Sequence, residues 1–186
     1  MGQPDADLIQ RWQQGDRSAF EALVRRWQDP IAKFLARQVG QLDLVQDLCQ
    51  EVFLRLYLAG ARYRESGVFS TWLYRIALNV ARDAARRGRT LPRVWPEQEL
   101  AIPDREGASP CEQQELAEVL TRALAELPPA LREVLVLRHY EAMNFEEMSR
   151  LLRVPASTLK SRFAVALGRL RLRLQQLGWS SEDSTS

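Results

Sequence analysis

Hydrophobic residues recur every three or four positions over most of this chain, which is the spacing of helices that bury one face. No run alternates in the way that predicts a β-strand. In the first half, the pattern predicts a short helix around Leu8, Ile9 and Trp12, a second that starts near Ser18 and is ended by Gly40, a third over 42–58 and a fourth over 70–87. These elements predict an all-α fold.

Two features of the second helix leave open where it begins and whether it is continuous. Either Asp16 or a capping box of Ser18 and Glu21 could begin it, because both supply a side-chain oxygen to the unpaired N–H groups of the first turn. Pro30 lies within the hydrophobic stripe and has no backbone N–H, so we expect a kink or a break there.

The helical pattern stops between residues 87 and 109, where three prolines and two glycines occur. Such a segment is typical of a flexible linker between domains. We therefore expect two small helical domains. The boundaries are an N-terminal domain over 1–88, a linker over 89–109, a C-terminal helix-turn-helix domain over 110–178 and a tail over 179–186.

Explicit helix-start signals mark the C-terminal part. They are Ser109 with Pro110 and Glu112, then Pro128-Pro129, then Asn144 with Glu147, which predicts a short helix over 145–152. A tight turn then leads to a long helix over about 156–176. A short helix, a turn and a longer helix form the helix-turn-helix arrangement. Arg153 stands in this turn, where such motifs often have glycine.

Composition excludes several classes of protein. The 186 residues are 46% hydrophobic, which is too apolar for a disordered chain. Their longest aliphatic run is too short to cross a membrane, and the first ten residues lack the pattern of a secretory signal. Cys49 and Cys111 are isolated, which favours reduced thiols in the cytoplasm over a disulfide framework.

The formal net charge of +2 conceals two basic segments. Residues 71–93 carry six basic side chains and one acidic, and residues 154–178 carry five basic and none acidic. Between them, residues 94–126 carry two basic and eight acidic side chains. Separate basic patches are typical of proteins that bind a polyanion, because binding releases condensed counterions. Arginine dominates the basic residues, which suits contacts to phosphate and guanine but equally reflects a GC-rich genome.

The fourth predicted helix presents one polar stripe. At 100° per residue its members fall within about 60° of one another, opposite a core face. They are Arg75, Asn79, Arg82 and Arg86. Arginine and asparagine make bidentate contacts to bases, although charged stripes are also commonly just solvated. Just before this helix, Arg62 and Arg64 alternate with aromatic residues. Tyr63 is the better candidate for stacking on bases, whereas Phe69 and Trp72 suit core packing equally well.

The last helix offers a second candidate DNA surface at its first turns, which are the part of a recognition helix that reads the major groove. Its outward residues there are Ser157, Thr158, Lys160, Ser161 and Arg162. An ordinary amphipathic helix of a bundle would show the same pattern. Catalytic signals are weak, because no phosphate-binding loop or metal-ligand spacing occurs and His139 is the single histidine.

Three motifs occur in order along the chain: DLCQEVFLRL over 47–56, FSTWLYRIALN over 69–79, and a group made of Leu127-Pro128, REVL over 132–135 and VPASTLKSR over 154–162. They resemble motifs of bacterial sigma factors of the extracytoplasmic-function (ECF) class. The first is similar to the D-L-V-Q-E-V-F-L-R-L helix of that family, the second to F-x-T-W-L-Y-R-I-A-x-N, and the third group to the second domain. The resemblance runs from about residue 8 to residue 174.

The resemblance implies a cytoplasmic initiation factor that binds core RNA polymerase, recognises promoter DNA and helps open the −10 element. The implied polymerase-binding residues are Asp47, Gln50, Glu51 and Arg55. The implied −10 residues are Arg62, Tyr63, Arg64, Trp72, Arg75, Asn79, Arg82, Asp83 and Arg86, and the last helix would read the −35 element. An anti-sigma factor is an expected further partner. No catalytic residue, metal, cofactor or membrane insertion is expected.

One departure from the family pattern leaves alternatives open. Val165 and Leu167 stand where the family often has arginines, which weakens expected phosphate contacts and leaves apolar surface for a partner. An interaction protein whose promoter recognition has decayed would account for this departure. A stand-alone helix-turn-helix regulator that binds duplex DNA and does not engage polymerase is a separate alternative. The polymerase-type helix over 42–58 favours the initiation factor, because a plain regulator does not need it.

Overall fold

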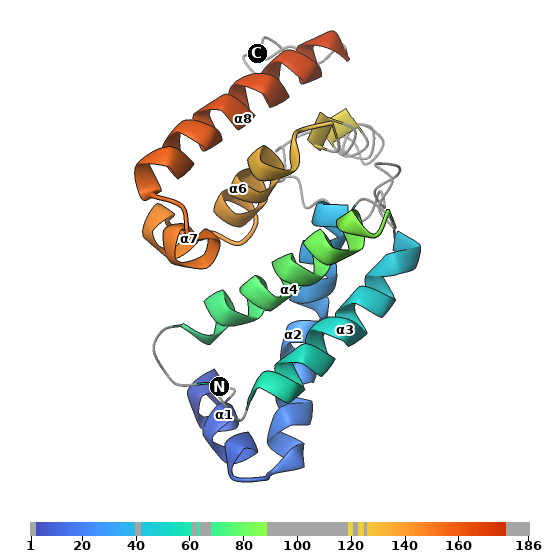
Figure 1. The fold of residues 1–186 in the computed structure, drawn as a ribbon, viewed down its shortest axis with the longest axis vertical. Helices are drawn as coiled ribbons and strands as arrows, with labels where there is room; N and C mark the ends of the chain where they lie inside the picture. The colour runs from blue at the N-terminus through green and yellow to red at the C-terminus, as the bar shows by residue number, and fades with distance from the viewer. Residues whose placement is uncertain are drawn as a thin grey trace, which may run out of the picture. The chain divides into compact units, whose positions relative to one another are not determined.

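The computed structural model describes residues 3–39, 42–60, 63, 68–88, 119–120, 123–124 and 126–177. Every regular element among these residues is a helix, as predicted (Figure 1). The helices fall into two compact units, α1 to α4 and α6 to α8. The linker over 89–109, the start signal at Ser109 and the tail over 179–186 lie outside the described residues, so the predicted domain boundaries stay predictions.

The first unit is built around its longest helix, α2, which contacts α1, α3 and α4, while α3 also packs on α4. The elements are α1 (Asp5–Gln13), α2 (Arg17–Val39), a short 3-10 helix (Leu42–Leu44), α3 (Val45–Gly60) and α4 (Phe69–Arg86). Each predicted helix is present. Leu23, Phe34, Leu56 and Leu73 are fully buried, and each such side chain stabilises the unit by roughly 1.5–3 kcal/mol.

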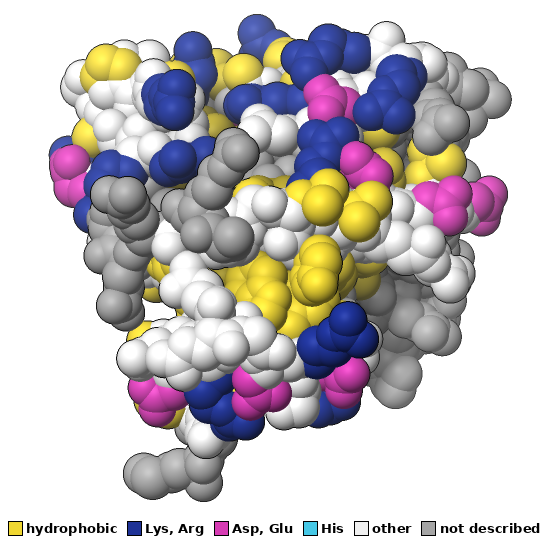
Figure 2. Space-filling model, turned by 60° about the horizontal axis from the view of Figure 1, so that its bottom comes forward, with side chains coloured by type: hydrophobic (Ala, Val, Ile, Leu, Met, Phe, Trp, Pro, Cys, Tyr) yellow, Lys and Arg dark blue, Asp and Glu magenta, His cyan; other side chains and the backbone are white. Residues whose placement is uncertain are grey.

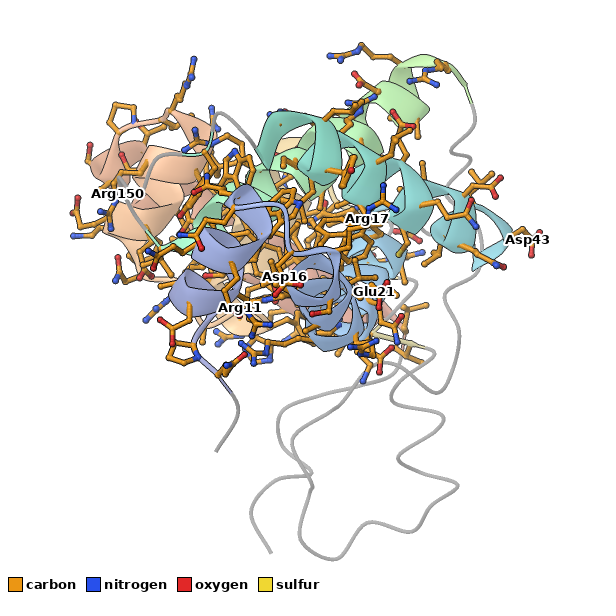
Figure 3. All side chains as sticks on the ribbon, turned by 90° about the horizontal axis from the view of Figure 1, so that it is seen from below. Arg11, Asp16, Arg17, Glu21, Asp43 and Arg150 are labelled. Atoms are coloured by element: carbon orange, nitrogen blue, oxygen red, sulfur yellow. The ribbon has the colours of Figure 1, made fainter. Side chains whose placement is uncertain are left out.

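Asp16 begins α2, which settles the choice between the two predicted caps. Its carboxylate accepts hydrogen bonds from the Ser18 backbone N–H at 2.9 Å and the Ser18 hydroxyl at 2.7 Å. Arg11 donates to the other oxygen at 2.6 and 2.9 Å, across the turn between α1 and α2 (Figure 3). The bonds from Ser18 and then Arg11 lower the pKa of Asp16 to about 2.

Pro30 does not break α2, which runs from Arg17 to Val39 as a single helix. The proline removes one backbone hydrogen bond, at a cost of about 3 kcal/mol. Directly after it, Ile31, Phe34 and Leu35 are completely buried. Keeping these three side chains on one helical face outweighs the lost bond, so the expected break is absent.

The second unit contains α6 (Pro129–His139), α7 (Phe145–Leu152) and α8 (Ala156–Gln176), and α8 packs on both of the others. Its core contains Leu124, Leu135 and Leu170. The predicted capping box of α7 is confirmed: the Asn144 side chain accepts from the backbone of Glu147 at 2.9 Å, and the Glu147 carboxylate accepts from the Asn144 backbone at 2.8 Å.

The turn between α7 and α8 forms with Arg153 in the left-handed conformation, at φ 57° and ψ 42°. Its N–H donates to the Ser149 carbonyl at 2.9 Å, which caps the last turn of α7. A residue with a Cβ is disfavoured in this conformation by roughly 1–2 kcal/mol. The helix-turn-helix therefore forms without the usual glycine, and Pro155 then leads into α8.

Candidate protein and nucleic-acid interfaces

The outer face of α3 carries the residues expected to bind polymerase. The inner face holds Val45, Leu48, Val52 and Leu56, all buried. Asp47 and Gln50 are exposed on the opposite side, and Glu51 is half-buried. The structure thus brings these three polar residues together on one helical surface, where a partner could reach them.

Three hydrophobic side chains on the same helix were missed by the sequence analysis. Leu54 is 53% exposed, Tyr57 50% and Leu58 70%. Figure 2 shows a face of the molecule on which hydrophobic side chains reach the surface between basic and acidic ones. Leu54 and Leu58 lie outside the buried stripe of α3, and that mismatch was the signal in the sequence. Exposed leucines of this kind commonly mark a surface that binds another protein.

The polar stripe of α4 faces away from the core, as the helical period predicts. Leu73, Val80 and Ala84 are buried on the core side, with Ile76 half-buried beside them. Across the helix, Asn79 is exposed and Arg86 has 73% of its side chain exposed, while Arg75 and Arg82 are half-buried. The stripe is therefore basic, accessible and rigidly presented by a helix with a well-buried opposite face.

Arg55 and Asp83 lie between α3 and α4 and bind each other. Arg55 Nη1 donates to Asp83 Oδ2 at 2.9 Å, and Arg55 Nε donates to Glu51 Oε1 at 2.7 Å. Arg86 pairs with the other oxygen of Asp83. The hydrogen bond from Arg55 is the largest cause that lowers the pKa of Asp83, and the bond to Asp83 in turn raises the pKa of Arg55. Residues expected to contact polymerase and promoter are thus partners within the chain.

An aromatic group stands at the start of α4. The rings of Tyr63 and Trp72 lie 4.5 Å apart between centroids, and both residues are half-buried. Phe69 is only 5% exposed and packs edge-on against Trp27, so it belongs to the core. Tyr63 and Trp72 form a partly accessible aromatic surface beside the basic stripe. Arg62 and Arg64, predicted to act with them, lie outside the described residues.

The first helix anchors the segment that carries Tyr63. Gln13 Nε2 donates to the carbonyls of Gly60 at 3.0 Å and of Tyr63 at 2.8 Å. The Trp12 ring lies directly on Gly60, where a Cβ would be 1.7 Å from the nearest ring atom. Glycine is therefore required at the end of α3, and α1 binds the backbone at Gly60 and at Tyr63.

The first turns of α8 present the residues expected to read DNA. Ser157, Lys160 and Ser161 are exposed, and Thr158 and Arg162 are half-buried. Nearby, Arg138 Cζ lies 5.4 Å and Lys160 Nζ 6.0 Å from the centroid of the Phe145 ring, so both are within cation–π range.

Hydrophobic residues are exposed farther along α8. Val165 is 49% exposed, Leu167 45% and Leu172 57%. The sequence analysis expected apolar surface at the first two positions, and their exposure is confirmed. Leu172 follows Val165 by two helical turns on the same side of the helix, whereas Leu167 lies on nearly the opposite side.

Other kinds of site find little support within the described part of the chain. No cluster of three histidine, cysteine, aspartate or glutamate side chains that could hold a metal occurs there. His139 is exposed and contacts the Tyr140 ring edge-on. None of the helices described is both long and apolar enough to span a membrane.

Comparison with known proteins agrees with this geometry. Residues 23–90 match the family model of sigma-70 region 2, and residues 117–170 match that of sigma-70 region 4. The chain is 32% identical to the RNA polymerase sigma-H factor of Pseudomonas aeruginosa over 93% of its own length and 95% of the relative. It is also 32% identical to the ECF RNA polymerase sigma-E factor of Escherichia coli K12, with the same coverage.

A solved structure gives the same result. The complex of CnrH with the cytosolic domain of CnrY contains a chain that is 25% identical, with a TM-score of 0.68, covering 92% of this chain and 97% of that one. Matches to both regions do not favour a stand-alone helix-turn-helix regulator. The chain belongs to the ECF class of RNA polymerase sigma factors.

Proposed function

We propose that this sigma factor binds core RNA polymerase with the outer face of α3, and that it recognises the −10 element with α4 and the −35 element with α8. The observation that carries the proposal is that α3 and α4 belong to one compact unit while exposing different surfaces, one mixed polar and apolar and the other basic. A protein that holds both polymerase and promoter DNA needs two such surfaces.

The polymerase surface comprises Asp47, Gln50, Leu54 and Leu58, with Glu51 at its edge. Polar residues at the start of α3 supply hydrogen-bonding groups, and the exposed leucines toward its end supply apolar contact area. An interface that combines a desolvated apolar part with a polar rim is common among protein complexes. The two leucines add to the polar residues that the family resemblance implied.

The −10 surface comprises the basic stripe of α4 and the aromatic pair before it. Arg75, Arg82 and Arg86 are suited to phosphate, and Asn79 to a base edge. Tyr63 and Trp72 are suited to stacking on unpaired bases, at about 1–3 kcal/mol per base. Combining phosphate contacts with stacking would favour the opened strand over the duplex.

The −35 surface is the N-terminal part of α8, where Ser157, Thr158, Lys160, Ser161 and Arg162 would face the major groove. The apolar residues farther along α8 would be available to a protein partner, and an anti-sigma factor is the partner proposed. We place the protein in the cytoplasm, where bacterial polymerase and promoters are, and we assign it no catalysis of its own because polymerase performs the chemistry.

Run-off transcription with purified core polymerase tests the proposal. Initiation should depend on this chain and be lost in Asp47→Ala/Gln50→Ala, whereas Gln28→Ala, an exposed glutamine on α2, should initiate normally.

Asn79→Ala in the holoenzyme should change base preference at the −10 element, at a cost of about 1–3 kcal/mol. Arg82→Ala should weaken binding to all promoters and reduce the salt dependence. Binding to duplex DNA without any initiation would instead support the stand-alone regulator.

A further inference from the structure

Four charged side chains form a continuous interhelical bridge from the outer face of α3 to the DNA-facing side of α4. In order they are Glu51, Arg55, Asp83 and Arg86. Arg55 and Asp83 are 28 residues apart in the chain, and their side chains are only 33% and 24% exposed. An ion pair that is partly shielded from solvent and makes direct hydrogen bonds is less screened by water than a fully exposed one.

We infer, building on the proposed function, that Arg55 and Asp83 are positioning residues that hold the promoter-binding stripe of α4 against α3 and do not themselves contact polymerase or bases. Asp83 is one turn beyond Asn79 and directly follows Arg82. Arg55 is one turn beyond Glu51, at the edge of the polymerase surface. The bridge therefore joins the two surfaces.

Geometry favours this role over direct contact for Asp83. Each of its carboxylate oxygens accepts from a different guanidinium group, Oδ2 from Arg55 and Oδ1 from Arg86. A carboxylate beside a surface that binds phosphates would repel them unless its charge is compensated. Arg55 supplies that compensation from α3, so the pairing protects the positive potential of the stripe as well as its orientation.

Geometry also separates Arg55 from the polymerase surface. Two of its donors are already directed at carboxylates, one on its own helix and one on α4. The planar guanidinium can make both bonds together because its donors are fixed in a fork. Lysine keeps the positive charge but lacks this fixed fork of donors, so the structure distinguishes Arg55→Lys from Arg55→Ala.

A double-mutant cycle tests the inference. Arg55→Ala, Asp83→Ala and the double variant would be assembled with core polymerase, and binding to a fluorescent single-stranded −10 oligonucleotide would be titrated alongside the affinity for core polymerase. Each single variant should weaken oligonucleotide binding about three- to tenfold, with unchanged core affinity. The double variant should bind the oligonucleotide no more weakly than the single variant that shows the larger loss. Arg55→Lys should recover part of the loss seen in Arg55→Ala.

Controls separate positioning from loss of the fold. Arg25→Ala removes an arginine whose ion pair with Glu21 is on the surface of α2, and it should bind oligonucleotide as the wild type does. Thermal unfolding would be followed for each variant, and Asp83→Asn, which keeps the size of the side chain, would replace Asp83→Ala if that variant unfolds. Discrimination between the −10 sequence and a scrambled one should fall in the bridge variants, a change that lower stability alone would not produce.

Two results would overturn the inference. One is an Arg55→Ala protein with reduced core affinity and normal oligonucleotide binding. The other is a double variant whose loss equals the product of the two single losses, which would mean that the residues act on separate partners. Failure of the proposed function is distinct, because then the wild-type protein itself would not direct polymerase to the oligonucleotide.

Discussion

Replacing Gly60 by alanine should destabilise the first unit, and the size of the effect follows from one close contact. A Cβ at this position would be 1.7, 2.2 and 2.5 Å from three ring atoms of Trp12. Carbon atoms in contact are normally about 3.5–4.0 Å apart, so the ring would have to move by about 2 Å. It has little room, because Trp12 is 9% exposed and packs on Phe20 at 4.9 Å and Tyr57 at 6.2 Å between centroids.

Two opposing contributions decide whether Gly60→Ala lowers or raises the free energy of unfolding. Forcing extra volume into a packed core costs about 1–3 kcal/mol. Alanine in place of glycine in a helix interior gains up to about 1 kcal/mol, and less at Gly60 because it is the last residue of α3. The net loss should be about 1–2 kcal/mol. For a unit of this size, that corresponds to a melting temperature lower by about 4–16 °C.

Calorimetry on Gly60→Ala would measure this, with two companion variants. Gly168→Ala, in α8, meets nothing within 4 Å and should leave the protein equally stable or raise stability by up to about 1 kcal/mol. In a Trp12→Leu background, Gly60→Ala should have little further effect, because the clashing ring is gone. A Gly60→Ala protein that melts at or above the wild-type temperature would refute the packing of Trp12 on Gly60.

Three further outcomes are expected. The pKa of Asp16 measured by NMR should be about 2, below its ordinary 3.8. The carboxylate's contribution to stability is therefore complete above pH 3.8 and is lost as the pH falls through about 2. In Ser18→Ala the pKa of Asp16 should rise, and an unchanged pKa would exclude the hydroxyl as the main cause of the shift. Asn144→Ala should lower the free energy of unfolding by about 0.5–2 kcal/mol in urea titrations, and no change would mean that the capping box is not formed in solution. Gln13→Glu keeps the size of the side chain but removes the donors to the Gly60 and Tyr63 carbonyls, so it should weaken −10 oligonucleotide binding by the holoenzyme; wild-type affinity would show that this anchor is dispensable.

Helix positions could be predicted from the sequence because their causes are local. The period of buried residues and the capping box at Asn144 are contained in short stretches of chain, and α7 has the predicted bounds. The break expected at Pro30 is absent, because the local penalty is visible in the sequence but the compensating burial of Phe34 depends on a distant residue, Tyr74 of α4, whose ring lies 5.0 Å away between centroids. The choice between Asp16 and Ser18 likewise depended on Arg11, which belongs to the preceding helix.

Surfaces were predicted less completely than helices. The basic stripe on α4 could be found because its residues share one helical face. The bridge from Arg55 to Asp83 could not, since no periodicity relates positions on two helices separated by a loop. The exposure of Leu54 and Leu58 has a signal in the sequence, because both positions lie off the buried stripe of α3, but the polar pattern of the helix does not reveal it.

The packing of α1 on the end of α3 changes how a deletion series should be interpreted. A chain shortened to begin after Gln13 would retain every side chain proposed to touch DNA or polymerase. It would nevertheless lose the indole that covers Gly60 and the amide that fixes Tyr63. Such a deletion would resemble the loss of a DNA-binding segment, although α1 contains no residue proposed to contact DNA and only supports the segment that does.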